Sequence, residues 1–182
     1  NAMNDANTAN TANTANTANT ANTANVANTV TARYAEAFAA LDSRGTPDWL
    51  AELRKAALAE FTSLGFPTTR NEDWHFTSVT PIAERTFRNA KPALSPSVTA
   101  VLALTVGDAA WPRAVFVNGR FDASLSSLGS LTAGVKVSTL TAALKESPDF
   151  VAAHLGKLAA FSKQAFTAFN TAFAQDGLVV HV

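Results

Sequence analysis

Hydrophobic residues after position 30 recur mostly at steps of three and four, the spacing that places side chains on one buried face of a helix. Tyr34, Phe38 and Leu41 follow this spacing and predict a first helix over 31–43. The same spacing predicts a second helix, whose buried face would consist of Leu50, Leu53, Ala57, Phe61 and Leu64.

Both ends of the second helix carry strong signals. At its start we expect Thr46 as the N-cap, Pro47 at the first helical position and Asp48 beside the positive end of the helix. Gly65, followed by a Phe-Pro pair, predicts the end, because glycine adopts the left-handed conformation that closes many helices and proline blocks continuation.

Strand-like patterns are short and fewer than the helical ones. The alternating segment 100–106 predicts a strand, and an apolar run at 115–117, followed by Asn118-Gly119, predicts a hairpin with a type I′ turn. The segments 134–140 and 177–182 predict two further strands.

Three more helices are expected in the second half of the chain. Ser138 or Thr139 would cap a short helix, and Pro148 would start another that runs through Leu155 to a break at Gly156. A last, Phe-rich helix is predicted over 157–175, with one apolar face made by Leu158, Phe161, Ala165, Phe169 and Ala172. This face suits a domain core, with a partner-helix docking site as the alternative.

The pattern as a whole predicts a mainly helical α+β fold with a small β-hairpin or sheet element. We expect a tag scar and low-complexity tail over 1–30, a mainly helical domain over 31–175, and the start of a truncated strand region over 176–182. The apolar run ends at Val182 without a polar exit, so we expect the natural protein to continue, because exposed apolar edge strands invite aggregation.

The first 30 residues contain Asn-Thr-Ala six times in succession from Asn7. A period of three matches neither a helix nor a strand and produces no apolar stripe. We interpret the segment as a flexible neutral tail, with a threonine array that binds ice or a surface as the alternative. If this tail is ordered, it should be a helix held by a neighbouring chain or by the crystal.

The composition of the chain argues against several classes of function. Fourteen basic and 14 acidic residues give a net charge of zero, and they are well mixed, which argues against nucleic acid as a partner. No apolar run approaches the roughly 20 residues of a membrane span. Cysteine is absent, so the chain has no thiolate ligands for zinc or an iron–sulfur cluster. The start of the sequence has neither the charged nor the apolar region of a signal peptide, and we expect a cytoplasmic protein.

One stretch, 66–82, concentrates chemically capable residues. Glu72, Asp73 and His75 lie within four positions and could form a metal-dependent site, since carboxylates and imidazole are metal ligands. A Glu-x-x-His pair in helical di-metal proteins needs a second copy, and the sequence has none. We therefore assign no catalytic, cofactor-binding or metal residues, and keep the metal-dependent enzyme as an alternative.

The other interpretation of this stretch is a structural corner between helices. Asn71 or Thr69 would cap the next helix, the acidic residues would lie near its start, and Trp74 with Phe76 would fill the core. The chain has no Gly-x-Ser-x-Gly, Walker or Gly-x-Gly-x-x-Gly motif that would indicate an enzyme class.

Four segments together resemble the SufD family of the SUF iron–sulfur cluster assembly machinery: "LGFPTTRNEDWHFTSVTPI" (64–82), "VFVNGRFDASLSSL" (115–128), "GVKVSTLTAAL" (134–144) and "FNTAFAQDGLVVHV" (169–182). They occur in the family's order, and the last is also similar to the paralogous SufB family. The resemblance implies a mainly helical N-terminal domain, a right-handed parallel β-helix and a C-terminal domain that binds the ATPase SufC.

The resemblance also implies a function. SufD is a non-catalytic subunit that pairs with SufB through the β-helix in a scaffold complex, so SufB and SufC are the expected partners. The chain would be the N-terminal domain and would end as 176–182 enters the β-helix. The family's functional histidine and SufC-binding region would lie beyond Val182, and the fragment would hold no cofactor. A stand-alone protein-interaction domain is the remaining alternative.

Overall fold

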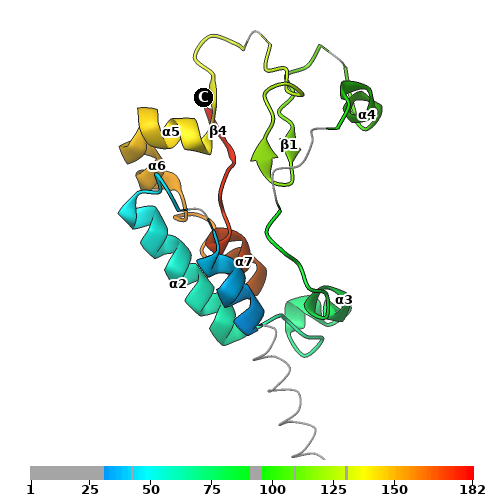
Figure 1. Cartoon of the computed structure of the whole chain (residues 1–182), viewed down its shortest axis with the longest axis vertical. Coiled ribbons are helices and arrows are strands. Elements are labelled where there is room, and N and C mark those ends of the chain that lie inside the picture. Colours follow the sequence, from blue (N-terminus) through cyan, green and yellow to red (C-terminus); the bar gives the residue numbers. More distant parts are fainter. Residues whose placement is uncertain (1–30, 42, 91–95, 109, 130) are drawn as a thin grey trace, which may run out of the picture.

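A helical layer forms one side of the molecule (Figure 1). It contains a helix over 31–39, the long helix α2 (Asp48–Leu64) and helix α7 (Ala165–Ala172), and α7 lies against α2. The computed structural model describes residues 31–41, 43–90, 96–108, 110–129 and 131–182. The low-complexity tail predicted over 1–30 lies outside these residues.

The smaller elements complete a mainly helical α+β fold, as the sequence predicted. They are η1 (Glu72–Trp74), α3 (Thr80–Ala83), α4 (Val98–Ala103), β1 (Phe116–Val117), β2 (Arg120–Phe121), β3 (Lys136–Thr139), α5 (Leu140–Glu146), α6 (Pro148–His154) and β4 (Leu178–His181). Within the described residues, the strands form two antiparallel two-stranded sheets, β1–β2 and β3–β4.

One of the two cores within the described residues is an aromatic core that includes Tyr34 of the first helix. Tyr34, Phe61 and Ala168 are buried at its centre, and rings from three segments surround them. Tyr34 meets four of these rings edge-on, with centroid distances between 4.8 and 6.4 Å: Phe61, Phe66, Phe169 and Phe173. Edge-to-face contacts of this kind add to the stabilisation that apolar burial provides.

A second core joins α5, α6 and the β3–β4 sheet to the start of α2. Leu140, Ala143 and Val151 are buried there, and Trp49 of α2 packs against them. Because α2 extends from Trp49 to Phe61, this helix connects the two cores and fixes their relative positions.

The hairpin and the β3–β4 sheet confirm the strand predictions at three of the four positions. Asn118 and Gly119 have φ angles of 51° and 77°, and Phe116 pairs with Phe121, as in a type I′ turn. In the second sheet Val137 pairs with Val180, so the predicted strands at 134–140 and 177–182 lie side by side.

The strand predicted over 100–106 is wrong, because residues 100–103 belong to helix α4 and residues 104–106 form no strand. The Ser97 side chain accepts a hydrogen bond from the Ala100 backbone N–H at 3.2 Å and caps the helix. A short apolar run does not by itself distinguish strand from helix, and here the cap decides. Figure 1 shows α4 apart from the helical layer.

The last helix is shorter than predicted. α7 begins only at Ala165, since Lys163 has a φ of 62°, which a helix does not allow. Leu158 is therefore 94% exposed instead of lying on the apolar face. Phe161 still packs against the aromatic core from the irregular segment before the helix.

Helix α2 follows its prediction with two corrections. Pro47 rather than Thr46 occupies the N-cap position, because its extended backbone lets its carbonyl accept the first helical hydrogen bonds. Leu64 is exposed, and Arg54 takes a buried place on the helix instead. The end at Gly65 is confirmed, with a φ of 66°.

The ends of α5 and α6 agree with the sequence, but the first helix ends at residue 39 instead of 43, and α7 ends at Ala172 instead of 175. The Thr139 hydroxyl accepts from the Ala142 N–H at 3.1 Å, so Thr139 rather than Ser138 caps α5. Helix α6 begins at Pro148, and the chain turns at Gly156, whose φ is 73°. A β-carbon at Gly156 would lie 3.0 Å from a Leu53 methyl group, so glycine also allows this turn to approach α2 closely.

Candidate functional site

The stretch after α2 is a tight corner held by its own backbone and short polar side chains. The Thr68 N–H donates to the Asn71 side-chain oxygen at 2.8 Å, and the Asn71 N–H donates to the Thr68 carbonyl at 2.9 Å. These bonds direct the chain into the single turn of η1. Asn71 occupies the predicted N-cap position, but its side chain bonds backwards and does not cap the turn.

The proposed metal ligands of this corner all lie at the surface. Glu72 and Asp73 are exposed in η1, and His75 is exposed directly after it. The Nδ1 atom of His75 lies 3.2 Å from the Thr69 carbonyl oxygen, so the ring is engaged with the backbone of its own corner. Within the described residues, no group of three or more His, Asp or Glu side chains could hold a metal ion.

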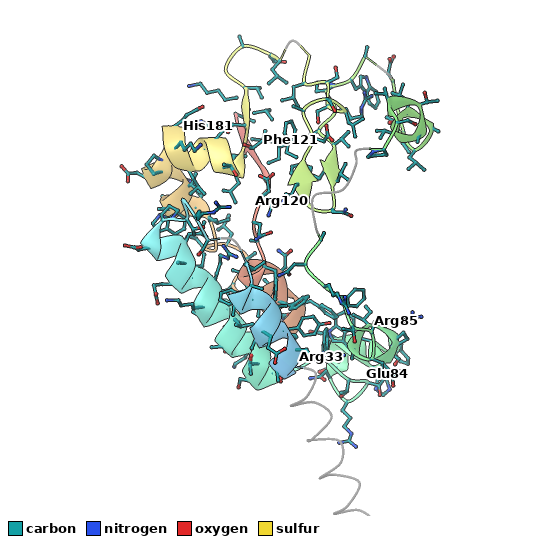
Figure 2. The ribbon with its side chains drawn as sticks, in the orientation of Figure 1. Arg33, Glu84, Arg85, Arg120, Phe121 and His181 are labelled. Carbon is teal, nitrogen blue, oxygen red and sulfur yellow. The ribbon has the colours of Figure 1, made fainter. Side chains whose placement is uncertain are left out.

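The other two histidines, His154 and His181, both contact the ring of Phe150. The Phe150 ring lies 4.5 Å from the His154 ring and 4.8 Å from the His181 ring, measured between centroids. His154 Nδ1 also lies 2.8 Å from the Phe150 carbonyl oxygen. These contacts tie α6 to β4, whose His181 is marked in Figure 2, at a place separate from the corner.

Trp74 anchors the corner to the helical layer. Its ring lies 5.1 Å from that of Phe166 on α7, and Val79, a few residues later, is buried. The prediction that Phe76 also fills the core is wrong, because Phe76 is 97% exposed, with its ring 4.8 Å from the His75 ring between centroids. Of the two aromatic residues, Trp74 therefore contacts the helical layer and Phe76 does not lie in the core.

The segment after the corner runs back along the first helix. Arg33 donates to the Thr86 hydroxyl at 2.7 Å, and the Asn89 side-chain amide donates to the Ala37 carbonyl at 2.7 Å. These contacts hold residues separated by more than 50 positions in the sequence. The corner therefore acts as a structural junction between α2, α7 and the first helix.

Arg54 is a buried cation that the sequence analysis missed. Its residue is only 4% exposed, its Nε–H donates to the Ala172 carbonyl at 3.1 Å, and its guanidinium carbon lies 5.7 Å above the centre of the Phe38 ring. Burial lowers the pKa of the Arg54 guanidinium from its ordinary value. The signal was its position, four residues after Leu50 and three before Ala57, on the buried face of α2.

A second set of polar contacts ties the hairpin to the segment after α7. The Arg120 guanidinium donates to the Gln175 side-chain oxygen at 2.8 Å, and the Phe121 N–H donates to the Asp176 carboxylate at 2.9 Å. Figure 2 shows Arg120 and Phe121 on the side of the hairpin that faces this segment. The Leu140 N–H also donates to the Gly177 carbonyl at 2.8 Å, so the same segment reaches α5.

In the described part of the chain, no helix has the length and apolarity needed to cross a membrane. No curated protein and no solved structure matches the chain. The family model described as the SufBD protein N-terminal region matches residues 24–182, which is most of the sequence and includes both cores, the corner and both sheets. The chain therefore belongs to the SufBD family.

Proposed function

We propose that the chain is the N-terminal domain of a SufD-type subunit and serves as a non-catalytic part of the SUF scaffold that assembles iron–sulfur clusters in the cytoplasm. The observation that carries this proposal is the family match over residues 24–182. SufB and SufC are its proposed partners, and the β4 end of the chain is its proposed junction with a β-helix.

The choice of SufD rather than SufB rests on two segments with clear structural roles. The "LGFPTTRNEDWHFT" segment ends α2 and forms the corner that Trp74 anchors to Phe166. The "FVNGRF" segment is the β1–β2 hairpin, which Arg120 ties to Gln175. Both segments join parts of the domain that are distant in the sequence, and a scaffold subunit requires such a fixed arrangement.

Co-purification tests the proposal. The protein that carries this chain would be co-expressed with tagged SufC and with SufB, with and without residues 31–168. We expect the intact protein to be recovered in a stoichiometric complex with both partners. Recovery without SufB and SufC under conditions in which those two bind each other would refute the scaffold proposal.

The deletion adds a second result. We expect the shortened protein still to associate, since the proposed partner-binding regions lie beyond this domain. Loss of both partners, for a deletion protein that stays soluble and monodisperse, would show that the domain itself makes the contacts and would contradict the proposed location of the interfaces.

A further inference from the structure

A cavity of about 460 Å³ lies among segments that are distant in the sequence. Its walls come from residues 44–46, from α2, from α5, from Arg120 of the hairpin and from 174–175 after α7. The volume falls within the range of roughly 300–1,000 Å³ that is typical of small-molecule sites. The cavity is separate from the corner at 66–82, and Arg120 and Gln175, which join the hairpin to the segment after α7, both line it.

The charge of this cavity is unlike that of the chain as a whole. Arg44, Arg54, Arg120 and Lys145 line it, and no described lining residue is acidic. The whole sequence, by contrast, has equal numbers of acidic and basic residues. Cations converge from four separate segments, so their grouping is a product of the fold and not of a local basic run in the sequence.

Arg54 contributes a buried charge to the lining of the cavity. Its known contacts are a backbone carbonyl and the face of a phenylalanine ring, neither of which neutralises the guanidinium. Within the described residues, no ion pair involves Arg54, Arg120 or Lys145. A buried cation without a counter-ion is costly, and a bound anion would remove most of that cost.

We propose that this cationic cavity binds a small phosphorylated molecule. Planar guanidinium groups form paired hydrogen bonds to phosphate oxygens, and Arg54 and Arg120 would supply them, with Lys145 as an additional point charge. Leu50 and Leu144 form an apolar part of the wall that would contact the carbon skeleton of the ligand.

The residues that line the cavity argue against a nucleotide as the ligand. It contains no aromatic ring on which a nucleobase could stack. Recognition through phosphate groups and a carbon skeleton fits a sugar phosphate or another alkyl phosphate better than a nucleotide. Two phosphate groups would match the several cations better than one.

Calorimetric titration of the purified 182-residue chain at low salt tests the proposal, with fructose bisphosphate, inorganic pyrophosphate and citrate as probes. The test variant is the double substitution Arg120→Gln and Lys145→Gln, because both residues are exposed; it removes the Arg120–Gln175 hydrogen bond, so circular dichroism and the thermal unfolding midpoint are measured first to establish that the variant is folded. The matched control is Arg85→Gln with Arg88→Gln, which removes the same charge from an exposed segment that does not line the cavity. Figure 2 shows Arg85 far from Arg120.

We expect one-to-one binding of the bisphosphate, tighter than that of citrate, and a loss of roughly tenfold or more in affinity for the test variant, with no change for the control. Arg54→Met should abolish binding. If that protein is unfolded, the test variant with Arg120→Gln and Lys145→Gln still tests the proposal. Absence of phosphate binding by the wild type, equal losses in the test and control variants, or tighter binding of citrate would each overturn the proposal.

Discussion

Replacing Tyr34 by phenylalanine should stabilise the protein, although it deletes a polar group from the aromatic core. Tyr34 is only 4% exposed, and its hydroxyl oxygen is buried without a hydrogen-bond partner in the described part of the chain. Burying a hydroxyl without a partner costs roughly 1–3 kcal/mol in proteins, whereas the ring contacts do not depend on it. We expect the variant to gain about 1 kcal/mol in the free energy of unfolding, since some of that cost is offset by local relaxation.

The pH dependence of the free energy of unfolding provides a second test of the buried Tyr34 hydroxyl. Burial raises the pKa of Tyr34, and the nearby Arg33 opposes this to a smaller degree. Because the folded state holds the proton more tightly, the contribution of Tyr34 to stability is fully present below the ordinary tyrosine pKa of about 10 and is lost as pH rises beyond it. The stability advantage of Tyr34→Phe over the wild type should therefore grow above pH ~10.

Urea denaturation of both proteins at neutral pH and at alkaline pH measures these differences. Tyr34 is the only tyrosine of the chain, so tyrosinate absorbance in an alkaline titration reports this residue alone. Tyr34→Leu is the matched control, because it removes the ring as well as the hydroxyl. It should lose at least about 1 kcal/mol, since each edge-on aromatic pair contributes ~0.5–1.5 kcal/mol beyond its buried area.

Two results would refute this reasoning. A Tyr34→Phe variant that is less stable than the wild type at neutral pH would mean that the hydroxyl makes a favourable hydrogen bond in the folded protein. A tyrosine that ionises at or below pH ~10 in the native protein would mean that its ring is not buried among the phenylalanines.

Three further substitutions probe single structural features. Thr139→Ala should cost about 1 kcal/mol of stability in denaturant unfolding, because it removes the cap on the Ala142 N–H; an unchanged midpoint would contradict the cap. Gly119→Ala should destabilise by about 1 kcal/mol, since alanine resists the φ of 77° in the turn, and calorimetry would show a lowered Tm. His75→Ala should change stability by less than ~0.5 kcal/mol and leave the metal content of the protein unaltered in elemental analysis, because the side chain is exposed; a metal lost on substitution would revive the metal-site alternative.

Signals that act between neighbouring residues predicted the local structure well. Asn118-Gly119 correctly predicted the hairpin, Thr139 correctly predicted the start of α5, and Gly65 correctly predicted the end of α2. Each of these features depends on one backbone conformation or one short-range hydrogen bond. The strand predicted at 100–106 failed for a related reason. Ser97, which caps α4, lies outside the apolar run from which the strand was predicted.

Features that depend on packing between distant segments were less accessible. Periodicity placed Leu64 and Leu158 in the core, and the interpretation of 66–82 as a corner placed Phe76 there. All three are exposed, because the chain turns at Gly65, at the corner and in the irregular segment before α7. The cationic cavity could not be predicted at all, since its cations come from parts of the sequence that only the fold brings together.

Genetic complementation tests the central claim, that the chain is part of a SufD-type subunit, most directly. The protein that carries it would be expressed in one strain that lacks SufD and in another that lacks SufB, each dependent on the SUF system, with activity of an iron–sulfur enzyme as the readout. We predict restored activity in the strain without SufD and none in the strain without SufB. Rescue only of the strain without SufB, or of neither strain by a protein that accumulates normally, would contradict the claim.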